Sequence, residues 1–279
     1  MMRWVRFGLA GLVAVYALVL AGMYSLQRDF IFDARDTGGR LFEAGTLAIE
    51  GSSRVAIETA DGETLAGWYL PPKQKDGNVF LFFHGKGGGL ERKKWRWQRI
   101  AEHGKGVLAF SYRGFPGSTG SPSEEGLFED ARAAFNWLSA RHSKDRIVLH
   151  GLSLGTGVAA KLATEVEARA LIIEAGYAAL VDVAGARHPY FPVSLLLWDQ
   201  FRTRDFIGRI KCPVMIAHGD KDTVIPFEHA EELYALAPEP KVFVVIPGGD
   251  HNTLVRDGIY QHIWKFIEKP DAYKAAGAG

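Results

Sequence analysis

Short apolar runs that alternate with helical patterns constrain the fold of this chain more than any other feature of its sequence. The runs lie at residues 79–83, 106–110, 146–149, 170–173, 213–217 and 242–246. Each is short and nearly continuous, as in strands that are buried on both faces. Between them, as at residues 127–138, apolar side chains recur with the helical period of about 3.6 residues. The alternation predicts a parallel sheet covered by helices on both sides.

The chain before the first of these runs predicts an antiparallel opening to the sheet. Residues 53–59 and 64–70 are rich in β-forming residues and are joined around Asp61-Gly62, a dipeptide suited to a tight hairpin turn. We therefore expect an eight-stranded, mostly parallel sheet in an α/β domain. The apolar positions from Leu254 to Ile267 predict a last helix that packs back on this sheet.

An uncharged segment at the N-terminus predicts a membrane anchor. Residues 7–26 contain no charged side chain, and about 20 apolar helical residues are enough to cross the hydrocarbon core of a bilayer. A cleaved signal peptide is the alternative, but its apolar region is usually shorter, at about 7–15 residues. The sequence Val19-Leu20-Ala21 also fits a small-residue cleavage site poorly. We expect an anchor helix over residues 1–27.

Flanking charges predict the orientation of this helix. Arg3 and Arg6 precede it, whereas Arg28 after it is followed at once by Asp29. The positive-inside rule then predicts a single-pass protein with a cytoplasmic N-terminus and an extracytoplasmic domain. We expect residues 28–50 to form an irregular lead-in, 51–270 the folded domain and 271–279 a flexible tail.

Composition argues against several classes of partner. The formal net charge is +1, and no stripe of Lys and Arg interleaved with aromatics is evident, so no nucleic acid is expected. Cys212 is the only cysteine of the 279 residues, which rules out an internal disulfide and a cysteine metal cluster. We expect the protein to need neither a metal ion nor a cofactor.

The motif Gly151-Leu152-Ser153-Leu154-Gly155 follows a predicted strand and opens a predicted helix. In that context the pattern predicts a sharp turn that lifts the Ser153 hydroxyl above the sheet edge. It also places the Leu154 backbone N–H at a helix start, where developing negative charge is favoured. The pentapeptide alone is equally compatible with a glycine-rich turn that carries a serine near a helix N-cap.

A second glycine-rich loop, His84-Gly85-Lys86 and the glycines after it, follows the predicted strand at 79–83. Its exposed backbone N–H groups predict an oxyanion donor at Lys86, as a partner to Leu154. A phosphate-binding loop is the alternative, but the spacing of the P-loop motif is absent. We interpret His84 as a residue that organises this loop.

Two further loops bring an acid and a base to the same sheet edge. Asp220 and Asp222 follow the strand at 213–217, and Asp250 and His251 follow the strand at 242–246. Ligands bind at the carboxyl ends of the strands in an open parallel sheet, so Ser153 is expected there too. The order serine, aspartate, histidine is the one found along alpha/beta-hydrolase chains.

Together these motifs resemble the alpha/beta-hydrolase superfamily, and more narrowly its small-lid, membrane-anchored members related to the serine-aminopeptidase-like hydrolase domain. The resemblance covers roughly residues 50–268. It rests on the His84-Gly85 loop, the serine motif, the His-Gly-x-x-Asp-x-x-x-Pro pattern from His218, a late Gly-Asp-His-Asn, and the segment after residue 110. In two places the chain departs from relatives, which often have Asp at Ser111 and Asn at Lys86.

The resemblance implies a catalytic triad of Ser153, Asp222 and His251. Two other carboxylates compete for the place of the acid: Asp250 adjoins His251, and Glu174 ends the preceding strand. Asp220 is expected to shape the turn. His150 and His218 are expected to pack near strand ends. The remaining histidines need no catalytic role; they are His103, His142, His188, His229 and His262.

The resemblance also implies a small lid between residues 175 and 209. Its apolar side chains either line an acyl pocket or pack a helix against the sheet, and packing is the interpretation we prefer; they are Tyr190, Phe191, Leu195, Leu196, Leu197 and Trp198. The function implied is hydrolysis of carboxylic esters, including acyl or lipid esters and thioesters, through an acyl-enzyme on Ser153. An aminopeptidase, an acyltransferase and a non-catalytic membrane-bound binding protein are the alternatives.

Overall fold

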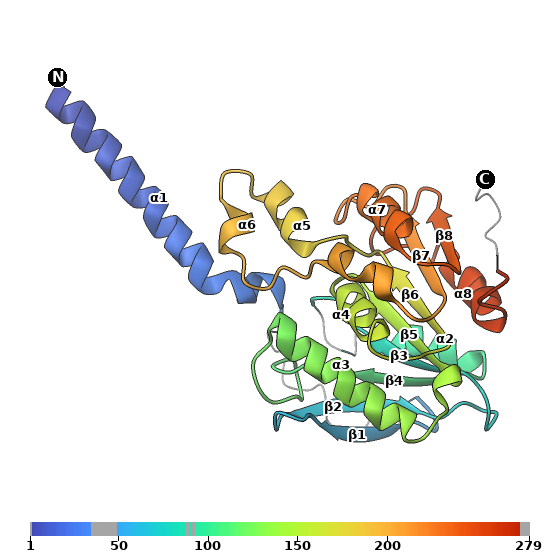
Figure 1. The fold of residues 1–279 in the computed structure, drawn as a ribbon. Coiled ribbons are helices and arrows are strands. Elements are labelled where there is room, and N and C mark those ends of the chain that lie inside the picture. Colours follow the sequence, from blue (N-terminus) through green and yellow to red (C-terminus); the bar gives the residue numbers. More distant parts are fainter. Residues whose placement is uncertain (1, 35–48, 88–89, 91–92, 274–279) are drawn as a thin grey trace.

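The computed structural model describes residues 2–34, 49–87, 90 and 93–273. Its centre is one eight-stranded sheet with the order β1-β2-β4-β3-β5-β6-β7-β8 (Figure 1). β1 is antiparallel to β2 and β2 to β4, and every later pair is parallel. The predicted fold class is therefore confirmed. The strands are β1 Ser53–Glu58, β2 Thr64–Leu70, β3 Val79–Phe83, β4 Gly106–Phe110, β5 Ile147–Leu152, β6 Ala170–Glu174, β7 Val214–Gly219 and β8 Lys241–Ile246.

The central strands are largely apolar because both of their faces are buried. Alternate side chains of one strand point to opposite faces of a sheet. In β3, Leu81 and Phe83 belong to one hydrophobic cluster, whereas Phe80 and Phe82 belong to a second. The two clusters lie on the two faces of the sheet.

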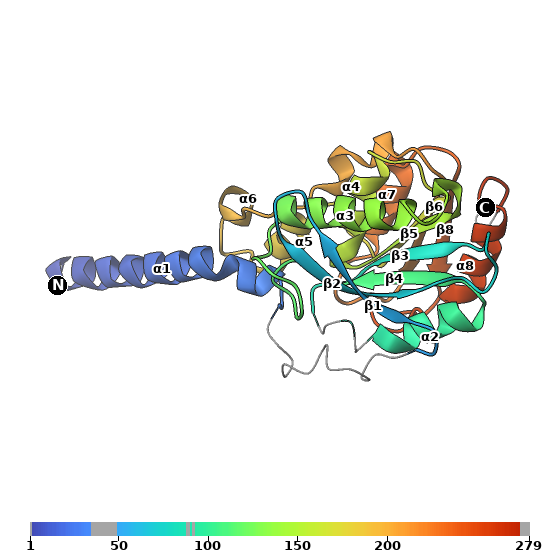
Figure 2. The same cartoon turned by 90° about the horizontal axis from the view of Figure 1, so that it is seen from below.

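Helices cover both faces, as the alternating pattern predicts. α3, α4 and α7 contribute to the cluster that contains Leu81, and α2 and α8 to the cluster that contains Phe80. Figure 2 shows α3 and α4 on one side of the sheet and α2 and α8 on the other. The bounds are α2 Lys94–Glu102, α3 Glu124–Ser139, α4 Leu154–Ala163, α7 Glu228–Leu236 and α8 Ile259–Glu268.

The last helix is shorter than predicted. Residues 251–258 form turns, and α8 begins only at Ile259, so the prediction of a helix from Leu254 is wrong. Gly258 separates the two segments with a φ of 105°, a conformation that L side chains rarely adopt. Leu254 and Val255 are nevertheless buried in the same cluster as α8. Residues 274–279 of the predicted tail lie outside the described residues.

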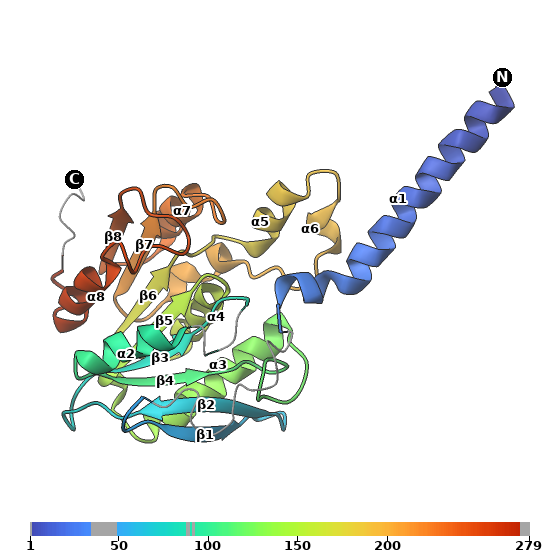
Figure 3. The ribbon, with the colours of Figure 1, turned by 180° about the vertical axis from the view of Figure 1, so that it is seen from behind.

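The N-terminal helix α1, Met2–Ile31, projects from the domain (Figures 1 and 3). It is long and apolar enough to cross a membrane, and no residue of its most apolar 18-residue window is buried. At its end Phe32 is 2% exposed and belongs to the core, so the helix is fixed to the domain. Residues 35–48 of the predicted lead-in lie outside the described residues.

A small lid follows β6, as the resemblance implies. It consists of α5 Leu180–Arg187, α6 Val193–Leu196 and the short 3-10 turns Thr203–Asp205 and Ile207–Arg209. Figure 1 shows α5 and α6 beside the C-terminal part of α1. The lid and α1 thus lie together above the carboxyl ends of the strands.

Candidate active site

Ser153 occupies a strained turn between β5 and α4. Its φ is 51°, which is unusual for a residue other than glycine and costs about 1–3 kcal/mol. The turn is tight because α4 starts against β3: a Cβ added at Gly155 would lie 2.2 Å from the Phe83 carbonyl oxygen. The glycine of the motif is therefore required by close backbone contact. This turn holds the Ser153 side chain at the sheet edge.

The structure brings Ser153, His251 and Asp222 together in one chain of hydrogen bonds. His251 Nε2 lies 3.0 Å from Ser153 Oγ, and His251 Nδ1 lies 2.8 Å from Asp222 Oδ2. An ionised carboxylate only accepts hydrogen bonds, so His251 donates from Nδ1 and leaves Nε2 free to accept the serine proton. In this tautomer His251 can act as a general base toward Ser153.

Every hydrogen bond around Asp222 favours its charged form. Oδ1 accepts from the backbone N–H groups of Val224 and Ile225, both at 2.8 Å. Burial alone would raise the pKa of Asp222, but hydrogen bonds from His218 and His251 outweigh it and hold the pKa well below its ordinary value. The carboxylate is therefore ionised at neutral pH.

His218 takes part in the site, a role that the sequence pattern did not predict. This fully buried side chain lies one residue before the end of β7, and its Nε2 lies 3.2 Å from Asp222 Oδ2 and 3.0 Å from the Ile225 carbonyl oxygen. Both neighbours are acceptors, so the Nε2 proton is shared between them. The sequence signal for this contact is the four-residue spacing between His218, near the end of the strand, and Asp222 in the loop that follows.

The competing carboxylates have other partners. Asp250 accepts hydrogen bonds from Thr223, through the backbone N–H at 2.9 Å and the hydroxyl at 3.0 Å. Asp220 accepts from the Gly248 N–H at 2.6 Å and so ties the two loops together. Asp220 shapes the turn, as predicted, and neither side chain contacts the His251 ring.

Glu174 pairs with a buried arginine. Arg96 of α2 forms two hydrogen bonds of 2.8 Å with its carboxylate, and His150 Nε2 lies 2.9 Å from Oε2. Burial opposes the charge of Glu174, but Arg96 and His150 lower its pKa to about 2. The Glu174 carbonyl oxygen accepts from the Ser153 N–H at 3.0 Å, so this buried cluster lies directly beneath the serine.

The predicted oxyanion donors, Lys86 and Leu154, belong to the two segments of backbone beside Ser153. Leu154 is the first residue of α4, where N–H groups lack a preceding helical carbonyl. The backbone of Gly85 passes beside the serine, since a Cβ added there would lie 3.3 Å from Ser153 Cβ. Both Lys86 and Leu154 line the cavity above Ser153, whereas residues 88 and 89 of this loop lie outside the described residues.

His84 organises the loop, as predicted. It is fully buried, with its Nδ1 2.8 Å from the Gly85 carbonyl oxygen and its ring 4.2 Å from the Tyr112 ring, measured between centroids. Burial lowers the pKa of His84 to about 3. The imidazole is therefore neutral at physiological pH.

A largely apolar cavity of about 330 Å³ opens above Ser153. Of the apolar lid residues named from the sequence, Phe191, Leu196 and Leu197 line it. Tyr190 and Leu195 are 85% and 82% exposed. The preferred interpretation, that this stretch packs a helix against the sheet, is therefore wrong.

Among the described residues, no group of three or more His, Cys, Asp and Glu side chains has the arrangement needed to hold a metal ion.

Comparison of the sequence with known proteins identifies the family to which this chain belongs. A family model described as the alpha/beta hydrolase fold matches residues 78–192. An uncharacterized protein of Mycobacterium tuberculosis is 37% identical over 86% of this chain and 87% of its own length. The lysophosphatidylserine lipase ABHD12 of Danio rerio is 32% identical over 63% of this chain and 51% of its own.

A solved structure has the same fold. The esterase Pf2001 of Pyrococcus furiosus superposes with a TM-score of 0.65 over 83% of this chain and 94% of its own, at 22% identity. The chain belongs to the alpha/beta hydrolase family.

Proposed function

We propose that this protein is a serine esterase that cleaves carboxylic esters of acyl or lipid substrates through an acyl-enzyme on Ser153. The observation that carries the proposal is the unbroken hydrogen-bond chain from Ser153 through His251 to Asp222. Ser153 lines an apolar cavity large enough for a small ligand. The lipase activity in the name of the relative ABHD12 supports the same class of substrate.

The reaction follows from the roles of these groups. His251 takes the Ser153 proton as the hydroxyl attacks the ester carbonyl, and Asp222 stabilises the imidazolium. The Lys86 and Leu154 N–H groups stabilise the oxyanion. His251 then protonates the leaving alcohol, and water releases the acid. General base action contributes about 10²- to 10⁴-fold and each oxyanion donor about 10²- to 10³-fold.

An aminopeptidase function lacks support from the lid carboxylates. Such an enzyme needs free acidic groups near the serine to bind the substrate ammonium. Asp199 pairs with Arg28, Asp205 with Arg202 and Asp182 with Arg204, and none of the three lines the cavity. Acyl transfer uses the same acyl-enzyme and differs only in the acceptor, so product analysis with added alcohol distinguishes it from hydrolysis.

The anchor and the orientation are part of the same proposal. Residues 1–27 anchor the protein in a single pass with the N-terminus in the cytoplasm, and residues 51–270 form the extracytoplasmic catalytic domain. α1 supports this by its length and its uncovered apolar surface. Protease added to intact cells should then degrade the domain, whereas protection until the membrane is permeabilised would reverse the orientation.

Fluorophosphonate labelling tests the nucleophile directly, because the probe reacts with an activated serine whatever the natural substrate is. Wild-type protein should be labelled, and Ser153→Ala should not. Asp222→Asn should lose most of the labelling rate, whereas Asp250→Asn should keep it, because the Asp250 carboxylate bonds Thr223 and the His251 backbone and the His251 ring bonds Asp222 instead. A folded wild-type protein that takes no label, or label that persists in Ser153→Ala, would contradict the proposal.

A further inference from the structure

The cavity above Ser153 has one wall that comes from α1. We name it the α1 wall, and its residues are Leu20, Met23, Tyr24, Gln27, Phe30 and Ile31. They recur every three or four residues and therefore share one face of the helix. At about 1.5 Å per residue the wall is about 16 Å long, and Ser153 lines the same cavity.

Specific contacts hold this face of α1 to the lid. Gln27 is 6% exposed, and its side chain accepts from the Trp198 N–H at 2.7 Å and donates to the Leu196 carbonyl at 3.3 Å. Arg28 forms an ion pair of 2.8 Å with Asp199, whose side chain is 4% exposed. The helix therefore cannot rotate or slide without breaking these polar contacts.

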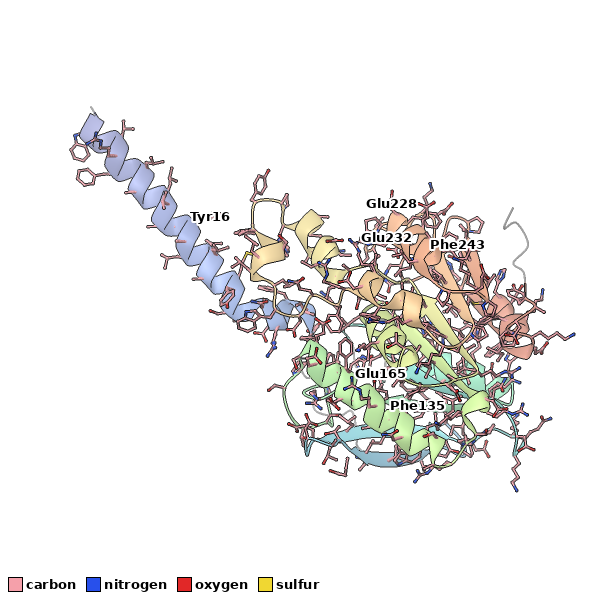
Figure 4. The ribbon with its side chains drawn as sticks, viewed as in Figure 1. Tyr16, Phe135, Glu165, Glu228, Glu232 and Phe243 are labelled. Carbon is pink, nitrogen blue, oxygen red and sulfur yellow. The ribbon has the colours of Figure 1, made fainter. Side chains whose placement is uncertain are left out.

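The contact continues farther toward the N-terminus. Tyr16, midway along α1 in Figure 4, donates to the Tyr190 carbonyl at 2.9 Å and stacks on the Phe191 ring. Phe191 itself lines the cavity. The lid thus lies along α1 from Tyr16 to Arg28 and encloses the space between them.

The end of α1 also contacts the loop that carries Lys86. The Asp33 N–H donates to the Lys86 carbonyl at 3.0 Å, and Lys86 Nζ donates to the Phe30 carbonyl at 3.3 Å. The wall, the lid and the loop beside the serine are therefore one connected unit.

We propose that the α1 wall and the lid form an acyl-chain subsite, so that α1 determines which acyl chains the enzyme accepts. The inference rests on the proposed esterase function. The ester carbonyl lies at Ser153, and a medium or long acyl chain extends along α1 toward Leu20. Leu20 and Met23 belong to the uncharged segment predicted to enter the bilayer, so the far end of the subsite lies at the membrane and the chain reaches Ser153 along apolar side chains.

Tryptophan substitutions on α1 test this inference. Leu20→Trp and Met23→Trp each place a bulky indole ring in the subsite, at two different distances from Ser153. Leu18→Trp is the matched control, because Leu18 is 73% exposed, does not line the cavity and lies on the opposite face of the helix. Full-length proteins in phosphatidylcholine vesicles are assayed with p-nitrophenyl esters from acetate to dodecanoate, after equal fluorophosphonate labelling confirms folding.

Each methylene that enters an apolar site favours binding by about 4-fold. Loss of two or more methylene contacts should therefore lower kcat/KM for dodecanoate at least about 10-fold in Leu20→Trp, with acetate unchanged. Met23→Trp should restrict the enzyme to shorter chains still, and Leu18→Trp should match the wild type. Chain-length profiles of all three variants that run parallel to the wild type would overturn the inference.

A separate measurement distinguishes failure of the subsite from failure of the esterase function. If the wild type hydrolyses no ester and takes no fluorophosphonate, the esterase proposal fails. Photo-cross-linking with a diazirine-bearing dodecanoic acid then tests where an acyl chain binds, independently of hydrolysis. Cross-links within residues 20–31 support it, and cross-links confined to other segments overturn it.

Discussion

Arg96→Met should destabilise the domain strongly, because it leaves a carboxylate buried beneath the active site without its main partner. The side chains of Arg96 and Glu174 are 5% and 0% exposed, and the variant loses both hydrogen bonds between them. Removing one member of such a buried pair costs about 3–5 kcal/mol. For a domain of about 150–250 residues, this corresponds to a fall in Tm of about 6–20 °C.

His150 makes the loss depend on pH. Burial lowers the pKa of His150 in the wild type, so it is neutral there. Without Arg96, His150 still lies 2.9 Å from the Glu174 carboxylate and should take up a proton. The destabilisation should therefore be smaller at pH 6 than at pH 8, and the pKa of His150 should rise in the variant.

Tryptophan fluorescence during thermal unfolding of the detergent-solubilised protein measures this effect. The double variant Arg96→Met/Glu174→Leu is the control, because replacing both members by apolar side chains removes the unpaired charge. It should recover most of the lost Tm. A fall of less than about 3 °C in Arg96→Met, or a double variant no more stable than the single one, would refute the reasoning.

Three further predictions concern the site and the loops around it. His218→Asn should lower kcat for p-nitrophenyl acetate about 10-fold at unchanged KM, because the hydrogen bond that helps to orient Asp222 is lost; an unchanged kcat would show that His218 only packs. Ser153→Gly should melt about 2–4 °C above Ser153→Ala, since both lack the nucleophile but only glycine relieves the φ of 51°; equal melting points would show that the turn is unstrained. His84 has a pKa lowered from 6.5 to about 3, so the unfolded chain binds the extra proton and the stability present above pH 6.5 is lost as the pH falls toward 3. Urea unfolding should show this loss as a slope of about 1.4 kcal/mol per pH unit that His84→Phe removes, and a slope unchanged in that variant would assign the acid sensitivity to other groups.

The sheet was predictable because its signal is local. The two-faced burial of a strand such as β3 requires apolar residues at every position, and that run is visible in the sequence. The last helix was predicted too long because Leu254 and Val255 are buried without being helical. The spacing of apolar residues indicates which positions are buried, whereas the start of the helix depends on the backbone conformation of Gly258.

The geometry of the candidate site was partly predictable. Chain order and loop position brought Ser153, Asp222 and His251 to one edge, and the structure places their side chains within hydrogen-bonding distance. The pairing of Arg96 with Glu174 joins residues 78 apart in the sequence, and no local pattern specifies such a contact. The sequence did not predict the α1 wall either, because the apolar side chains of such a helix can contact lipid or protein equally well.

The two faces of α1 therefore have different environments along its C-terminal part: one faces away from the domain, and the other packs against the lid. The face that contains Leu18 needs only to be apolar, so many residues should serve there equally well. The face that contains Leu20 and Gln27 must also match the shape and hydrogen bonds of the lid. On the proposed function, exchanging this helix for an unrelated anchor of equal length should keep the protein at the membrane and still change the range of esters that it hydrolyses.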